Sequence, residues 1–161
     1  MPVDADCLLL FHKTASGESE DKDYPDAVQV QGWKWGASYS NRGIAGDKGG
    51  HGDLKNFVFW HYLDSASPIL LHHCEKGMTI PLVTLMMRRQ GGTAQKFIEI
   101  TFNKVRVISI EMESTPTMKL PLEHVELAFN KVNFEYMTQS QEGRNSSRGA
   151  VSFNWIAELF G

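Results

Sequence analysis

The residues best suited to hold a metal ion are the six histidines. Two of them, His72 and His73, are adjacent and are followed by Cys74. Neighbours on a helix point about 100° apart, so no two of these side chains in succession can easily bind one ion. A zinc site needs ligands at i, i+4 spacing or in a short loop with orienting partners, and neither pattern is present. We expect no metal site and no cofactor, with His72 exposed and His73 partly buried.

The sequence also lacks the patterns of catalytic nucleophiles. No serine lies in a Gly-x-Ser-x-Gly elbow, and neither Cys7 nor Cys74 lies in a recognisable protease context. Carboxylates cluster in residues 13–26, but a mobile, water-exposed loop does not shift their pKa values as acid–base catalysis requires. We therefore expect a protein that is not an enzyme, with a solvated acidic turn and two cysteines that serve as small buried hydrophobes.

Residues 41–53 carry five glycines and could be mistaken for a phosphate-binding loop. A P-loop needs Gly-Lys-Ser/Thr at the start of a helix, whereas Gly49-Gly50-His51-Gly52 leads into a predicted strand. Loops of this length are usually functional or disordered. We interpret the segment as a flexible arm that reaches a neighbouring subunit or orders only on contact.

The overall composition indicates one globular domain over residues 1–161, with 42% hydrophobic and 22% charged residues. A formal charge of -3 gives no basic surface for nucleic acid. No apolar run is long enough to predict a transmembrane helix or other membrane attachment. The apolar stretch near the N-terminus is too short for a signal peptide, which predicts assembly in the cytoplasm.

Strand patterns dominate the chain. Residues 97–102 alternate, placing Ile98, Ile100 and Phe102 on one face, as in a half-buried strand. Three longer stretches, 28–39, 105–112 and 125–136, change the phase of their alternation midway. Each phase change requires a bulge, a bend or a tight turn. Because such irregularities let a sheet curl, they favour a barrel or a tightly curled sandwich.

One short helix is predicted from Ser67 to the residue before Gly77. Ser67 is expected to cap the first turn through its hydroxyl, with Pro68 at the first helical position. Gly77 supplies the left-handed conformation that ends many helices.

The tryptophans and phenylalanines of the strands are divided between the core and an opposite face, where exposed aromatic side chains suggest protein contact.

Several short motifs follow one another in an order that resembles the Hcp family, the tube subunit of the bacterial type VI secretion system. They are the turn Gly17, Glu18 and Ser19; Gly32-Trp33-x-Trp35-Gly36; the strand 55–64; Ser67-Pro68-x-Leu70; Gly77; Gly91-Gly92 with Phe97-Ile98-x-Ile100 after it; and Phe153-x-Trp155. The resemblance covers essentially the whole chain. It implies a mainly β fold, a curled two-sheet β-barrel with one short α-helix packed against it.

The resemblance also implies a function in mechanical assembly. Six copies of an Hcp protein form a ring, and the rings stack into a tube inside a contractile sheath. Contraction expels the tube without a signal peptide, and the lumen can hold effectors. The implied partners are further copies of this chain and the sheath, spike and effector proteins of the apparatus. Phage tail-tube proteins resemble this fold, so a phage-type tube is the nearest rival.

Two further hypotheses concern the glycine-rich segment and the alternative function. From its length and mixed charge, we predict that Arg42, Asp47, Lys48 and His51 contact a stacked neighbouring ring. The competing function is a monomeric β-barrel that binds a small ligand in the manner of lipocalins, with an enlarged apolar interior.

Overall fold

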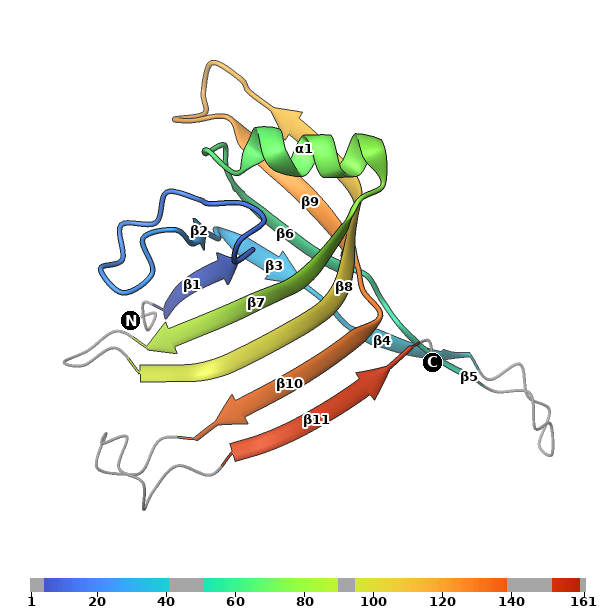
Figure 1. The fold of residues 1–161 in the computed structure, drawn as a ribbon. Helices are drawn as coiled ribbons and strands as arrows, with labels where there is room; N and C mark the ends of the chain where they lie inside the picture. The colour runs from blue at the N-terminus through green and yellow to red at the C-terminus, as the bar shows by residue number, and fades with distance from the viewer. Residues whose placement is uncertain (1–4, 41–50, 90–94, 139–151, 160–161) are drawn as a thin grey trace.

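A computed structural model describes residues 5–40, 51–89, 95–138 and 152–159 (Figure 1). Eleven strands and one helix follow in this order: β1 (Ala5–Leu10), β2 (Val28–Gln29), β3 (Gly32–Lys34), β4 (Ala37–Ser40), β5 (His51–Leu54), β6 (Phe57–Tyr62), α1 (Ser67–Lys76), β7 (Thr79–Arg89), β8 (Gln95–Glu113), β9 (Leu122–Ala128), β10 (Lys131–Met137) and β11 (Ser152–Glu158). The predicted fold class, mainly β with one short helix and two sheets, is confirmed.

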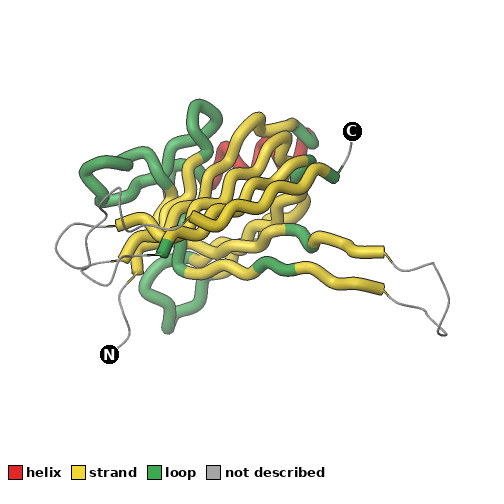
Figure 2. The backbone as a smooth tube through the Cα atoms, turned by 90° about the horizontal axis from the view of Figure 1, so that it is seen from below, coloured by secondary structure: helices red, strands yellow, loops and turns green. Residues whose placement is uncertain are grey.

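The larger sheet is antiparallel and contains nine strands. Its order is β2-β1-β7-β8-β9-β6-β3, with β10 paired to β8 and β11 paired to β10. The smaller sheet is the β4–β5 pair, which extends away from the main body (Figure 2). The long strand β8 joins the two halves of the larger sheet, because its first part pairs with β10 and its last part pairs with β9.

The predicted phase changes each coincide with an irregularity in the sheet. The β8–β9 register shifts between Val107 and Ser109. Phe129 and Asn130 form the short connection between β9 and β10. The strand that runs through residues 28–34 is interrupted between β2 and β3. A further shift at Met87 and Arg88 was not predicted. These irregularities let the sheet curl as Figure 1 shows.

The curled sheet encloses an aromatic core. Phe57 and Phe59 of β6 and Phe102 of β8 are fully buried, and the rings of Phe57 and Phe102 lie 4.9 Å apart. The end strands β2 and β3 of the larger sheet come together at residues 30 and 31, where Val30 N donates to Cys7 O and Gln31 N donates to Trp60 O. Among the described residues, single hydrogen bonds and not a continuous ladder join the two ends of the sheet here.

The helix α1 forms where the sequence predicts it and packs against β8 through the buried Leu70. Gly77 ends it in a left-handed conformation with φ of 64°. The prediction that Ser67 caps the helix was wrong, because the N-cap residue is Ala66 and no side chain caps the first turn. The hydroxyl of Ser67 instead accepts a hydrogen bond from Asp64 N at 3.1 Å. No helix in the described ranges has the length and apolarity needed to cross a bilayer.

Candidate functional site

The Gly-Glu-Ser turn packs tightly against the segment that leads into β2. Gly17 N donates to Asp26 O at 2.8 Å, and Ser19 N donates to Ala27 O at 3.0 Å. A Cβ atom at Gly17 would lie only 2.5 Å from Ala27 O, so the close approach requires glycine. Gly17 and Ser19 are buried. The prediction of a mobile, water-exposed loop was therefore wrong for the backbone of this turn.

The same turn is bound to the start of helix α1. Ser65 N donates to Glu18 Oε2 at 3.1 Å, and Ser65 Oγ donates to Ser16 O at 2.7 Å. Asp64 Oδ1 in turn accepts a hydrogen bond from Ala66 N, the amide of the N-cap residue. Two motifs that are distant in the sequence thus meet and fix the helix to one end of the sheet.

The tryptophan motif begins on β3, an end strand of the larger sheet, and contacts the neighbouring strand β6. Trp33 stacks on Phe57 with ring centroids 5.7 Å apart. The indole of Trp35 donates to Lys55 O at 2.8 Å, and Lys55 N donates to Gly36 O at 2.9 Å. These contacts join β3 and its following turn to the start of β6. Trp33, Trp35 and Gly36 thus make contacts that join neighbouring strands.

A buried cation that the sequence analysis missed lies on β7. The guanidinium of Arg88 forms ion pairs with Asp21 of the acidic turn and with Asp6 of β1, and only 8% of its side chain is exposed. The hydrogen bond from Arg88, more than any other contact, lowers the pKa of Asp21 below its usual range. The available signal was a pair of arginines, Arg88 and Arg89, directly after a long apolar strand run.

A second buried ionisable group was also missed. His61 Nε2 lies 2.7 Å from Glu123 Oε1, and both side chains are inaccessible to solvent. Asp64 lies 3.7 Å from His61 Nδ1, and burial is the main reason that the pKa of Asp64 is raised. The available signal was the alternation of β6, which places His61 on the same buried face as Phe57 and Phe59.

The remaining residues considered for chemistry lie apart from these pairs. His72 is exposed and His73 is partly buried, as predicted. In the ranges that the structure describes, no group of three or more histidines, cysteines, aspartates or glutamates is placed to hold a metal ion. Cys7 is buried as expected, and its burial raises the pKa of the thiol to about 12; Cys74 is only partly buried.

An exposed apolar surface lies on β11, which follows β10 at the margin of the larger sheet (Figure 1). Among the described strands, β11 pairs only with β10. Its side chains of Phe153, Trp155 and Ile156 are 58%, 47% and 56% exposed. Because side chains alternate along a strand, Ile156 lies on the face opposite Phe153 and Trp155. The strand therefore combines a free backbone edge with apolar groups on both faces.

The residues predicted to contact a stacked ring cannot be placed in this geometry. Arg42, Asp47 and Lys48 lie outside the described residues. His51 begins β5, but its side chain is also outside the description. Their role stays a prediction.

Comparison with known proteins agrees with this architecture. Residues 9–136 match the family described as "Type VI secretion system effector, Hcp". Protein hcp1 of Pseudomonas aeruginosa is 31% identical over 142 residues, which cover 86% of this chain and 87% of that protein.

Solved structures give the same result. One described as a type six secretion system protein superposes with a TM-score of 0.83 at 25% identity, covering 94% of this chain and 95% of that chain. Hcp1 from Salmonella typhimurium superposes with a TM-score of 0.74 at 26% identity, covering 96% and 94%. With its curled sheet, its single docked helix and its match over most of its length, this chain belongs to the Hcp family of type VI secretion system proteins.

Proposed function

We propose that this protein is a structural subunit of the type VI secretion inner tube, which assembles as hexameric rings that stack and enclose effectors. The observation that carries the proposal is the unpaired apolar edge of β11. An exposed, long edge strand with hydrophobic side chains is a template for pairing with another chain. If the contact is heterologous and its rotation closes, the product is a ring.

The proposed role is mechanical and does not involve catalysis. Arg88 joins β7 to β1 and to the acidic turn, and His61 joins β6 to β9, as a rigid structural subunit requires. The sheath, spike and effector proteins are the further partners that we propose, with release from the cell through the secretion apparatus. The lipocalin-like alternative has less support, because aromatic side chains fill the interior of the curled sheet.

Substitutions on β11 test this proposal. Changing Phe153 and Ile156 to lysine places charges on both faces of the edge strand, so we expect light scattering to detect monomers in place of rings. The matched control is Leu71→Lys, which changes an exposed apolar residue on helix α1. Rings of unchanged mass in the β11 variant would contradict the proposed interface, and circular dichroism would establish that the variant is folded.

We also propose that the segment 41–53 contributes to contacts between rings. The β4–β5 pair that carries it extends beyond the main sheet (Figure 2). Deletion of residues 46–50 should leave the ring intact and weaken stacking. Loss of the ring itself would show that the segment has a different role.

A further inference from the structure

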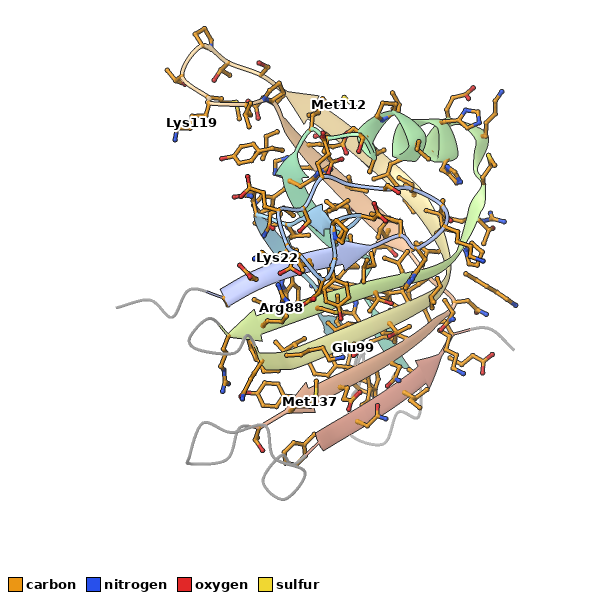
Figure 3. The ribbon with its side chains drawn as sticks, turned by 60° about the vertical axis from the view of Figure 1, so that its left-hand side comes forward. Lys22, Arg88, Glu99, Met112, Lys119 and Met137 are labelled. Atoms are coloured by element: carbon orange, nitrogen blue, oxygen red, sulfur yellow. The ribbon has the colours of Figure 1, made fainter. Side chains whose placement is uncertain are left out.

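A surface hollow of about 590 Å³ lies between the acidic turn, the start of β1 and the end of β6. Its lining includes five carboxylates and no lysine or arginine: Asp6, Glu18, Glu20, Asp21 and Asp64. The buried Arg88 near the end of β7 pairs with two of them, Asp6 and Asp21 (Figure 3). Glu18 and Glu20 are exposed and form no ion pair within the described residues. The hollow therefore keeps an excess of negative charge.

The hollow also has an exposed apolar rim, formed by Tyr62, Leu63 and Leu120. Leu120 is 53% exposed. Its neighbour Lys119 lies on the hairpin between β8 and β9, at the margin of the molecule (Figure 3). Apolar groups next to unpaired charges supply both buried area and electrostatic complementarity, which a contact with another protein uses.

A second, smaller hollow of about 390 Å³ has the opposite charge. Lys104 and Arg106 line it together with Phe129 and Asn130, and no carboxylate does. Both cations are exposed, and neither forms an ion pair in the described part of the chain. The exposed side chain of Met78 lies next in sequence to Thr79, another lining residue. This surface thus combines unpaired positive charge with apolar groups.

The two hollows lie at opposite ends of the strands. The acidic turn and the start of β1 lie on the side of the N-terminus, whereas the β9–β10 turn and the start of β7 lie on the opposite side (Figure 1). A second copy placed end to end with the first therefore turns its basic end toward the acidic end of the first.

This direction is distinct from the contact proposed at β11. A neighbour that pairs with the edge of β11 lies beside the strand, at the usual spacing of about 4.8 Å between paired backbones. Such sideways contacts leave the two ends of the strands free. In a ring built from β11 contacts, the acidic hollows would face one side of the ring and the basic hollows the other.

We infer that the acidic hollow around Glu18 and Glu20 binds the basic hollow around Lys104 and Arg106 of a second copy in the next ring. The contact is head-to-tail, which allows unlimited stacking because each ring presents both complementary surfaces. The inference rests on the proposed ring function, and it assigns described residues to stacking in addition to the segment 41–53. It predicts stacks that weaken with salt, because exposed charges are screened.

Charge reversal at each end tests the inference. Rings of Glu18→Lys/Glu20→Lys and of Lys104→Glu/Arg106→Glu should keep their mass. Each should need an at least about tenfold higher concentration for half of the rings to stack, measured by sedimentation velocity and negative-stain images. The matched control is Glu75→Lys/Glu111→Lys, which makes the same charge change at exposed sites that line neither hollow. Glu20→Lys alone, which spares the bond from Ser65 to Glu18, should show a smaller shift in the same direction.

Mixing the two variants separates charge complementarity from structural damage. Rings of the first variant carry basic groups at both ends, and rings of the second carry acidic groups at both ends. Preassembled rings of the two kinds should therefore stack alternately when mixed, although neither stacks alone. Variant rings that stack like the wild type, or mixtures that stay unstacked, would overturn the inference.

The wild-type protein distinguishes this failure from failure of the proposed function. Absence of any ring contradicts the tube proposal and the inference together. Wild-type rings that do not stack contradict the stacking in both proposals, whereas rings whose stacking is unchanged by either charge reversal overturn the inference alone.

Discussion

His61 and Glu123 are register partners on the adjacent strands β6 and β9, and their side chains meet at 2.7 Å with no access to solvent. His61 lies near the end of β6, just before the turn that leads to helix α1. One further atom of each side chain, His61 Nδ1 and Glu123 Oε2, has no hydrogen-bond partner in the described residues. Each residue therefore depends on the other for its main polar contact.

We expect His61→Leu to lower the free energy of unfolding by about 3–5 kcal/mol, because it leaves the Glu123 carboxylate buried without its partner. Urea denaturation at neutral pH measures the loss. The double variant His61→Leu/Glu123→Leu should recover much of it, since neither buried polar side chain remains. His72→Leu, at an exposed histidine, is the control and should change stability by no more than about 0.5 kcal/mol. A His61→Leu variant as stable as the control would contradict this account of the pair.

The ion pair between Arg88 and Asp21 predicts a dependence of stability on pH. The hydrogen bond from Arg88 lowers the pKa of Asp21 in the folded protein, so the unfolded chain takes up a proton at higher pH than the folded one. The stability that this carboxylate contributes is therefore fully present above its unfolded pKa of about 3.9, and it is lost as pH falls from there through the folded pKa.

Asp21→Asn should lower stability at pH 7 and have a progressively smaller effect below about pH 4, where the wild-type contribution is lost. Urea denaturation of both proteins between neutral and acidic pH measures the difference. Asp23→Asn, at an exposed aspartate of the same turn, is the matched control. An Asp21→Asn effect that stays constant with pH would show that ionisation of this group does not stabilise the fold.

Two glycines of the family motifs should respond differently to alanine. Gly17→Ala places a Cβ atom 2.5 Å from Ala27 O and 2.7 Å from Val28 Cα, so we expect a loss of about 1–3 kcal/mol in unfolding free energy. Gly36→Ala meets no atom within 4 Å and should be neutral or slightly stabilising. Thermal unfolding of the two variants distinguishes them, and equal effects would refute the steric explanation.

The two cysteines should differ in reactivity. Burial raises the pKa of the Cys7 thiol to about 12, so the reactive thiolate is scarce at pH 8 and is also shielded. A disulfide reagent should therefore modify Cys7 only as fast as the protein unfolds. Cys74→Ala, which retains only Cys7, isolates this reaction, and rapid labelling of that variant in native buffer would be inconsistent with a buried Cys7.

Local patterns predicted the helix and the irregular strands because the determinants are near in sequence. Pro68 and Gly77 delimit α1, and the phase change after Val107 corresponds to the bulge before Ser109. The capping role of Ser67 was predicted wrongly, because its hydroxyl has a competing donor, Asp64 N, that only the folded turn brings close.

Local sequence patterns could not predict contacts between residues that lie far apart in the sequence. Arg88 and Asp21 are separated by 67 residues, and nothing in either segment identifies the other as its partner. The same holds for His61 and Glu123, which pair only because β6 lies beside β9. The free edge of β11 depends on the order of the whole sheet, so the sequence indicated aromatic content there but not an unpaired strand.

The mass of the purified protein in solution, measured by light scattering after gel filtration and combined with negative-stain images, tests the central claim most directly. We predict a particle of six subunits with a central hole, which lengthens into stacks at low salt. A monomer at high concentration, with no rings in the images, would contradict the proposal that this chain forms the tube.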